Sequence, residues 1–191
     1  MHVVLETERL LLRRFSVDDA EALMELESDP EILRYVGRKP LADLDAYRQH
    51  IQSRLLPYDS RPEGYGGWVI LEKASGDFLG GCSLKPALDS RSAVEMGFGA
   101  EEIEVGYGLR RRSWGKGYAT ELVQALVRMA FTKFGAPCVV ASVSIDNVAS
   151  VRVLEKAGLR RIGEAVYLPG EDGASVKYVV TKGQFEHGHM L

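Results

Sequence analysis

The spacing of apolar residues predicts two helices in the first third of the chain. A strand over residues 10–15 precedes them, Ser16 stands where it would cap the first helix, and Asp29-Pro30 marks the end of that helix. The second helix is expected over about residues 43–55, and we predict that Pro57 closes it. The apolar positions that carry this pattern are Val17, Ala20, Leu23 and Met24 in the first helix, and Leu44, Tyr47, Ile51 and Leu55 in the second.

The rest of the chain mixes strands with helices. Residues 58–67 are rich in Gly and Pro and predict a loop, and residues 85–102 have no clear period. Strands are predicted over residues 68–73, 78–84, 103–109, 138–143, 159–167 and 176–180, and helices over residues 118–134 and 147–157. This order predicts a mixed α/β domain with antiparallel hairpins and one central strand–helix–strand crossover.

Length and composition add limits to this fold. The chain has 191 residues, which fits one domain over residues 1–191, with residues 183–191 expected as a flexible tail. The formal net charge of −3 does not favour nucleic acid or a membrane surface as a partner. We see no secretory signal and no run near the roughly 20 apolar residues that span a bilayer, so we expect a cytoplasmic protein. The two cysteines form no CxxC pair, and we expect no metal.

The strand over residues 103–109 carries two glycines on one of its faces. Ile103, Val105, Tyr107 and Leu109 point to one side of this strand, and Glu104, Gly106 and Gly108 point to the other. Glycine weakens a strand and leaves its backbone bare, so such a face is typical of close approach by a ligand. An amide-bearing ligand would be able to pair with this backbone as a further strand does.

A phosphate-binding loop is predicted directly after this strand. The segment Arg112-Ser-Trp-Gly115-Lys-Gly117 leads into the helix that begins at Tyr118. Glycines let backbone N–H groups turn toward one point, and the first turn of a helix adds unpaired N–H groups and partial positive charge. Arg110, Arg111, Arg112 and Lys116 add further positive charge.

Two other phosphate motifs do not fit the segment. A Walker A loop needs Ser or Thr after Gly-Lys, but Gly117 follows Lys116, and Arg110 stands at the place of the first glycine. A dinucleotide fingerprint needs a third glycine, and Thr120 stands at that place.

The loop resembles the R/Q-x-x-G-x-G/A pyrophosphate loop of the GNAT superfamily of N-acetyltransferases. The opening Thr7-Glu-Arg-Leu-Leu-Leu-Arg13, the run Glu104-Val-Gly-Tyr107 and the later Asp146-Asn147-x-x-Ser150 also resemble this superfamily, in the branch typified by the ribosomal-protein-alanine N-acetyltransferases. The resemblance continues through Glu155-Lys156-x-Gly158-Leu and covers most of the chain in the right order.

The resemblance implies a fold and a co-substrate. The fold would be a mixed, mostly antiparallel sheet flanked by helices, with residues 103–109 and 138–143 as two middle strands that splay apart. The pantetheine of acetyl-CoA would lie in that gap, against the backbone near Val105, Tyr107 and Leu109, with Asn147 on the other side. The pyrophosphate would lie on the loop and the first helical turn, at Arg110, Arg112, Gly115, Lys116, Gly117, Tyr118, Ala119 and Thr120.

The resemblance also implies a reaction, the transfer of an acetyl group to a primary amine. Glu104 is the candidate base, and a salt-bridged strand glutamate is the alternative interpretation of this residue. Many superfamily members carry a tyrosine as the general acid on the helix after Asn147, and here Leu154 stands at that place. Ser150 is the substitute candidate, and an ordinary polar residue of the first helical turn is the alternative.

Two functions remain open at this point. One is an enzyme whose acceptor is a protein N-terminus or a small-molecule amine. The other is a non-catalytic acyl-CoA-binding module of the same fold, which the leucine at position 154 favours. The sequence does not settle the acceptor or the oligomeric state, for which a homodimer is one alternative.

Overall fold

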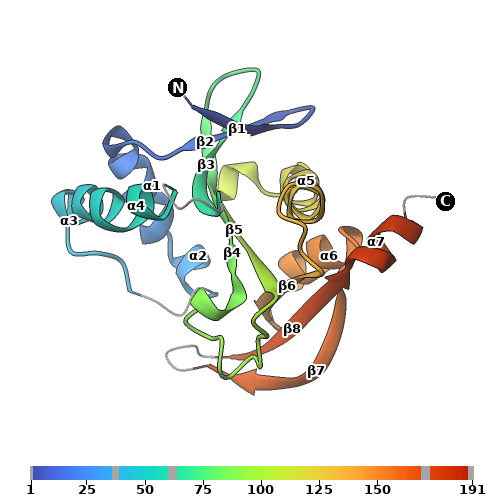
Figure 1. Cartoon of the computed structure of the whole chain (residues 1–191). Coiled ribbons are helices and arrows are strands. Elements are labelled where there is room, and N and C mark those ends of the chain that lie inside the picture. The colour runs from blue at the N-terminus through green and yellow to red at the C-terminus, as the bar shows by residue number, and fades with distance from the viewer. Residues whose placement is uncertain (1, 36–38, 60–63, 169–172, 189–191) are drawn as a thin grey trace. The chain divides into compact units, whose positions relative to one another are not determined.

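The computed structural model describes residues 2–35, 39–59, 64–168 and 173–188 (Figure 1). These residues fall into two compact units. The first unit consists of Met1–Ser83 and Tyr107–Ala119, and the second of Leu84–Gly106 and Thr120–Leu191. The loop expected over residues 58–67 lies in part outside the described residues, as does the turn expected over residues 169–173.

The strands of the first unit are β1 (Val3–Glu6), β2 (Leu10–Arg14), β3 (Gly66–Glu72) and the first part of β4 (Phe78–Pro86). Strand β2 pairs antiparallel with both β1 and β3. The C-terminal part of β5 (Glu102–Leu109) joins them, since the N–H of Arg110 donates to the carbonyl of Leu79 at 2.8 Å. Strand β1 was not predicted, because four residues are too few to establish an alternating pattern.

The helices of the first unit follow the expected order with one correction. A 3₁₀ turn (Val17–Asp19) leads into α1 (Ala20–Ser28), and α2 (Pro30–Leu33), α3 (Leu44–His50) and α4 (Leu56–Asp59) follow. A π-helical turn (Ile51–Leu55) joins α3 to α4, so the prediction that Pro57 ends the helix is wrong. Pro57 lies directly after the π-helical turn, in which the Leu56 N–H donates to the Ile51 carbonyl, and proline has no N–H to continue this series of hydrogen bonds.

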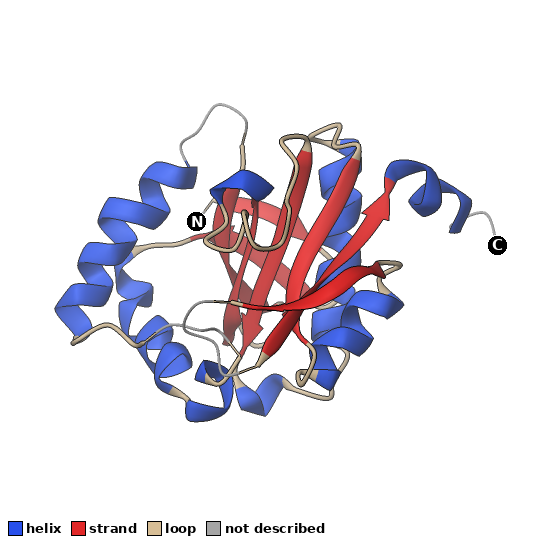
Figure 2. Ribbon diagram, turned by 90° about the horizontal axis from the view of Figure 1, so that it is seen from below, coloured by secondary structure: helices blue, strands red, loops and turns tan. Residues whose placement is uncertain are grey.

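The second unit contains the N-terminal part of β5 and the strands β6 (Cys138–Ser144), β7 (Arg160–Tyr167) and β8 (Ala174–Thr181). Strand β8 pairs antiparallel with β6 and with β7. Its helices are α5 (Tyr118–Thr132), α6 (Val148–Lys156) and α7 (Lys182–Gly188), and a 3₁₀ turn covers Ala87–Asp89. Figure 2 distinguishes these helices and strands by colour.

The strand order is β1-β2-β3-β4-β5-β6-β8-β7, in which β5 belongs to both units. The pairs β1–β2, β2–β3, β6–β8 and β7–β8 are antiparallel, whereas β5 and β6 are parallel. The mixed, mostly antiparallel α/β fold expected from the sequence is therefore confirmed. Among the described residues, no helix is long and apolar enough to cross a membrane.

Strands β5 and β6 separate after a short parallel register. Glu102, Ile103 and Glu104 pair with Cys138, Val139 and Val140. Within the second unit as described, the register ends there, although Val105 and Gly106 belong to the same unit and β6 pairs with β8 as far as Ser144. The splay expected between the two middle strands thus begins after Glu104.

The C-terminal segment forms α7 over Lys182–Gly188, and the last three residues lie outside the described part of the chain. The Phe185 ring contacts the Phe131 ring of α5, with 5.1 Å between centroids. The predicted flexibility of residues 183–191, and the single domain over residues 1–191, stay predictions.

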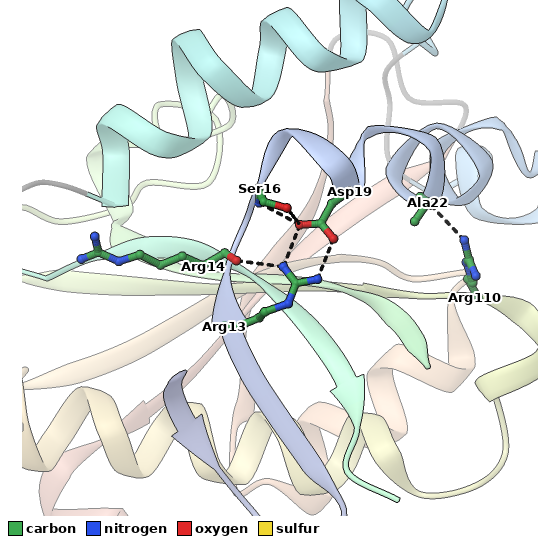
Figure 3. A network of polar contacts seen from close by, with 6 residues as sticks. All are labelled: Arg13, Arg14, Ser16, Asp19, Ala22 and Arg110. Carbon is green, nitrogen blue, oxygen red and sulfur yellow. Dashed lines mark hydrogen bonds and ion pairs between the residues drawn. The ribbon is translucent and has the colours of Figure 1, made fainter. Parts of the chain in front are cut away.

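A buried polar network fixes the start of α1 against β2. Arg13 donates through Nη1 and Nη2 to both carboxylate oxygens of Asp19, at 2.7 and 2.6 Å (Figure 3). The Ser16 N–H also donates to Asp19 Oδ2 at 2.7 Å, as in a capping box. Burial raises the pKa of Asp19, but the hydrogen bonds from Arg13 and Ser16 outweigh it, and the net pKa is lowered.

We predict that Asp19→Asn destabilises the fold by about 1–3 kcal/mol at pH 7, since it removes charged hydrogen bonds from a buried site. Because the folded-state pKa of Asp19 is lowered, its stabilising effect is present above the ordinary carboxyl pKa of about 4 and is lost as pH falls through the folded value. The free energy of unfolding, measured with urea, should therefore fall more steeply below about pH 4 for the wild type than for the variant.

Asp45→Asn is the matched control, because Asp45 pairs with Arg48 at 2.7 Å but its side chain is 86% exposed. This variant should change the unfolding free energy by less than about 0.5 kcal/mol. Equal losses of unfolding free energy in Asp19→Asn and Asp45→Asn would contradict a special role for the buried Arg13–Asp19 pair.

Strand β4 approaches β5 so closely that one position accepts only glycine. A Cβ built on Gly80 would lie 2.0 Å from the carbonyl oxygen of Gly108 and 2.9 Å from Cα of Leu109. A Cβ on the neighbouring Gly81 would meet Phe15 Cζ at 3.5 Å and the Trp68 oxygen at 3.8 Å, which is ordinary contact.

We predict that Gly80→Ala destabilises the protein by about 2 kcal/mol or more, because backbone atoms must move to admit the methyl group. Gly81→Ala should stay within about 1 kcal/mol of wild type. Thermal unfolding of the two variants checks this, and a similar melting temperature for both would show that β4 and β5 do not meet as described.

Candidate functional site

Glu104 is buried on β5 and has a partner on each carboxylate oxygen. Its side chain is only 10% exposed, and Lys85 Nζ lies 2.9 Å from Oε2. Ser90 Oγ donates to Oε1 at 3.1 Å and contacts Ser92 Oγ at 3.3 Å. Both partners come from residues 85–102, for which no clear period predicted an element. The ion pair matches the alternative interpretation of Glu104, and a role as base stays a prediction.

Glu102 makes a second lysine–carboxylate pair on the same strand. Lys177 Nζ of β8 lies 2.7 and 2.6 Å from its two oxygens and also donates to the Gly97 carbonyl at 3.1 Å. Gly99 N–H donates to Glu102 Oε2 at 2.9 Å. This pair therefore fixes residues 97–99 against the strand. Because Glu102 also lies on β5 and is also paired with a lysine, it is a suitable control residue for Glu104.

The predicted phosphate loop joins β5 to α5 with its glycines in the left-handed region. A 3₁₀ turn (Arg111–Ser113) comes first, and Gly115 and Gly117 then have φ of +73° and +82°. Only glycine adopts such angles at no steric cost, which lets successive N–H groups turn to one side. Helix α5 begins at Tyr118, and its first N–H groups have no partner within the helix.

The charged side chains of this loop divide into two kinds. Arg112 and Lys116 are exposed beside the glycines. Arg110 instead points to α1, where Nη2 donates to the Ala22 carbonyl at 3.3 Å (Figure 3). The same Nη2 also donates to Glu25 Oε2 at 2.5 Å. Burial lowers the pKa of Arg110, with Glu25 acting in the other direction. The predicted cofactor contact of Arg110 is untested, and its guanidinium is already engaged.

Aromatic side chains hold the loop in place. Trp114 Nε1 donates to the Leu109 carbonyl at 2.7 Å, so that carbonyl has a partner within the first unit. Tyr118 is buried, and its hydroxyl donates to Glu72 Oε1 at the end of β3. The contact of Tyr118 with Glu72 was not predicted from the sequence.

The second unit holds the other predicted residues at the start of α6. Asn147 is the N-cap, and its Oδ1 accepts the N–H of Ser150 at 3.1 Å. The amide Nδ2 of Asn147 is not used by this cap. Leu154 is 1% exposed, so the position where relatives carry a tyrosine is part of the core here.

The predicted site residues therefore form two groups. The first unit brings together Tyr107, Leu109, Arg110, Arg112, Gly115, Lys116, Gly117, Tyr118 and Ala119 on the end of β5, the loop and the start of α5. The second unit holds Glu104, Val105, Thr120, Asn147 and Ser150. Among the described residues, no group of three or more His, Cys, Asp or Glu side chains fits a metal ion. The absence of a metal stays a prediction.

The sequence did not predict which residues contact Glu104 and the loop between β5 and α5. Lys85 and Ser90 are partners of Glu104, and Arg9 contacts the loop through the Lys116 carbonyl. Arg9 was noted only as part of the opening run of residues, and nothing in the sequence indicated its contact. All three are distant in sequence from the residues that they touch.

Sequence comparison identifies the family. The model of the acetyltransferase (GNAT) domain matches residues 9–160, which include residues of both units. The N-acetyltransferase p20 of Bacillus licheniformis is 31% identical over 83% of this chain and 83% of its own length. The FsC-acetyl coenzyme A-N(2)-transacetylase of Aspergillus fumigatus is 29% identical over 93% of this chain and 76% of its own length.

Solved structures agree on the fold. An acetyltransferase of the GNAT family from Bacillus anthracis has a TM-score of 0.75 at 22% identity and covers 94% of this chain and 98% of its own. The aminoglycoside acetyltransferase AAC(6')-Ib, in complex with ribostamycin and coenzyme A, has a TM-score of 0.75 at 24% identity, with 94% and 97% covered. Together with the match to the family model, these similarities show that the chain belongs to the GNAT family and is an acetyl-CoA-dependent N-acetyltransferase.

Proposed function

We propose that the protein transfers the acetyl group of acetyl-CoA directly to a primary amine, with Glu104 as the base. The observation that carries the co-substrate is the loop between β5 and α5. The donor set for a diphosphate is formed by Gly115 and Gly117 at positive φ, by the exposed Arg112 and Lys116, and by the backbone N–H groups at a helix start.

In this proposal the loop holds the pyrophosphate of acetyl-CoA. Arg112 and Lys116 supply charge, and Gly115, Gly117, Ala119 and Thr120 supply backbone N–H groups. Tyr118 holds the first turn of α5 in position. Arg110 is proposed to hold the start of the loop, because its side chain is bonded to α1 and its N–H donates to the Leu79 carbonyl.

The pantetheine arm is proposed to pair with the backbone of β5 at Val105, Tyr107 and Leu109. Support comes from the early end of the β5–β6 register and from Gly108, where a built Cβ meets nothing within 4 Å. The helix cap uses only Oδ1 of Asn147, and its Nδ2 amide is the proposed second contact to the pantetheine arm.

Formation of the amide from an ammonium requires two protons to leave the nitrogen and a C–N bond to replace the C–S bond. Glu104 takes the first proton, directly or through a water. The amine nitrogen then attacks the thioester carbon, the C–S bond breaks, and the nitrogen releases its second proton, which balances the one taken up by the sulfur of the departing CoA. A backbone N–H of β5 at Tyr107 or a neighbour stabilises the oxyanion between these two steps.

The proton for the departing thiolate has a less specialised source. Ser150 on the first turn of α6 is the proposed proton donor, since the aliphatic side chain of Leu154 has no acidic group. A thiol is fairly acidic, so the thiolate also leaves without a protein acid.

The acceptor is proposed as a protein N-terminus or a small-molecule amine. Names among the relatives and structural neighbours support small amines, since they include a transacetylase for FsC and an aminoglycoside acetyltransferase. The ribosomal-protein-alanine branch rests on the sequence runs alone. The homodimer and the cytoplasmic location also stay proposals.

The alternative left open by the sequence, a non-catalytic acyl-CoA-binding module, is not the function that the family match indicates. The buried Leu154 at the position of the tyrosine acid and the ion pair of Lys85 with Glu104 are the features that such a module would share. Both functions require CoA binding, so turnover separates them. Acetyl-CoA consumption across a panel of amines and N-terminal peptides is the test, and no turnover with any acceptor would favour the module.

We predict that Glu104→Gln lowers kcat by about 100-fold or more, because general base catalysis contributes factors of this size. Affinity for CoA should change by less than about threefold, since the diphosphate contacts remain. Steady-state kinetics and calorimetry with CoA measure the two quantities. Glu102→Gln is the matched control, a lysine-paired carboxylate on the same strand, and it should retain kcat.

The double variant Lys85→Met, Glu104→Gln tests the structural alternative. It removes both charges of the pair, so it should recover the stability that Glu104→Gln loses through the unpaired lysine. Recovered stability with kcat still low supports a base, whereas recovered kcat would show that Glu104 serves only as the partner of Lys85.

We predict that Gly108→Val weakens CoA binding by about tenfold or more, because the side chain would occupy the space that the pantetheine arm needs. The strand itself should tolerate valine, and the melting temperature should change little. Calorimetry with CoA and thermal unfolding check both statements, and unchanged affinity would place the pantetheine elsewhere.

A further inference from the structure

Arg9 reaches from the turn between β1 and β2 to the phosphate loop within the first unit. Its Nη1 donates to the carbonyl oxygen of Lys116 at 2.9 Å, although 107 positions separate the two residues. Its guanidinium carbon lies 4.8 Å from the centroid of the Tyr118 ring. A Cβ built on Gly117 would lie 3.3 Å from Arg9 Nη2, so the guanidinium covers the backbone of residues 116–118.

This contact fixes the direction of one N–H group of the loop. In a trans peptide the carbonyl and the following N–H point in opposite directions, and the described residues contain no cis peptide bond. With the Lys116 carbonyl directed to Arg9, the Gly117 N–H is directed away from it. Gly117 at φ +82° is free of a side chain that would resist this orientation.

The two neighbouring turns hold Arg9 and Tyr118 in register. The Lys73 N–H donates to the Arg9 carbonyl at 2.9 Å, and Lys73 Nζ lies 3.1 Å from Glu6 Oε2. Glu72 accepts the Tyr118 hydroxyl on Oε1 and the Ser75 hydroxyl on Oε2, the latter at 2.7 Å. The ring on which Arg9 lies is therefore itself held by the turn between β3 and β4.

The charges around the loop are consistent with this arrangement. The hydroxyl of Tyr118, followed by that of Ser75, lowers the pKa of Glu72, and Lys116 adds to the effect. Glu72 is thus a carboxylate at neutral pH and remains a hydrogen-bond acceptor for Tyr118. Arg9 contributes a cation to the same surface as Arg112 and Lys116, all of them exposed.

We propose that Arg9 is a positioning residue for the acetyl-CoA phosphate loop, holding the peptide between Lys116 and Gly117 so that the Gly117 N–H faces the diphosphate. This inference rests on the proposed function. Arg9 acts through the loop backbone and not on the thioester, so it sets affinity for the diphosphate part of acetyl-CoA and leaves the chemical step unchanged.

The test compares Arg9→Ala with two acetyl donors. With acetyl-CoA, KM should rise by about tenfold, the effect of losing one oriented charged hydrogen bond, while kcat stays within about twofold. With acetyl-pantetheine, which lacks the diphosphate, KM should be the same for the variant and the wild type. Calorimetry with CoA should give the same loss of affinity, and thermal unfolding monitors the fold.

Conservative and control variants separate orientation from charge. Arg9→Lys keeps the charge but loses the planar fork that bonds the carbonyl and covers the Tyr118 ring, so it should recover only part of the affinity. Arg14→Ala removes an exposed cation from the same hairpin, and it should leave affinity for CoA unchanged. Full recovery in Arg9→Lys would mean that charge alone matters and would overturn the positioning role.

The outcomes distinguish this inference from the function on which it rests. If the wild type binds no CoA, the proposed function fails. If the wild type binds CoA and Arg9→Ala binds it equally well, only the role of Arg9 fails. An equal rise of KM for acetyl-CoA and acetyl-pantetheine would also overturn the inference, because the loss would then not depend on the diphosphate.

Discussion

The backbone of β5 and of the loop after it is the feature on which the rest of the structure depends. Up to Glu104 this strand pairs with β6, and from Tyr107 to Leu109 it belongs to the first unit beside β4. The close approach at Gly80 fixes that second part, because a single methyl group there would collide with the Gly108 carbonyl. The proposed pairing of the pantetheine amides with this backbone requires a strand that is held firmly along one edge.

Lysine–carboxylate pairs stabilise the first part of β5. Glu102 and Glu104 are successive residues on one face of the strand, and each is paired with a lysine from another segment. Removing one partner of such a pair leaves a buried charge without compensation, which costs more than the pair contributes. Glu104 is buried and paired, and it is also the proposed base, so a single substitution would change stability and chemistry together. For this reason the double variant is more informative than either single one.

The phosphate loop depends equally on contacts from distant parts of the chain. Its glycines permit left-handed backbone, but they do not choose the direction of each peptide group. In the first unit that choice comes from hydrogen bonds, with Arg9 on the Lys116 carbonyl and Trp114 on the Leu109 carbonyl. Anion binding by backbone requires several N–H groups to converge, and a flexible glycine loop without such contacts would lose entropy on each binding event.

The sequence by itself determined the elements and the family. Periodic apolar positions located α1, α3, α5 and α6 and most strands, because helix and strand faces repeat every 3.6 and 2 residues whatever surrounds them. Glycine spacing between Leu109 and Tyr118 predicted a glycine turn before a helix, and Gly115 and Gly117 do have positive φ, because glycine adopts such angles locally. Phosphate binding by this loop stays a prediction. Strand β1 was not predicted, and the prediction that the helix ends at Pro57 was wrong. Both segments are too short for a periodic pattern of apolar residues to be recognised.

Only the tertiary structure decided which polar side chains meet. Arg110 stands among the loop cations in the sequence, yet its guanidinium is bonded to α1, whereas Arg9, distant in sequence, contacts the loop. Lys85 and Ser90 lie in a segment without periodicity, and both reach Glu104. Long polar side chains sample many directions, so their partners are fixed by the packing of the backbone that carries them and not by their neighbours in sequence.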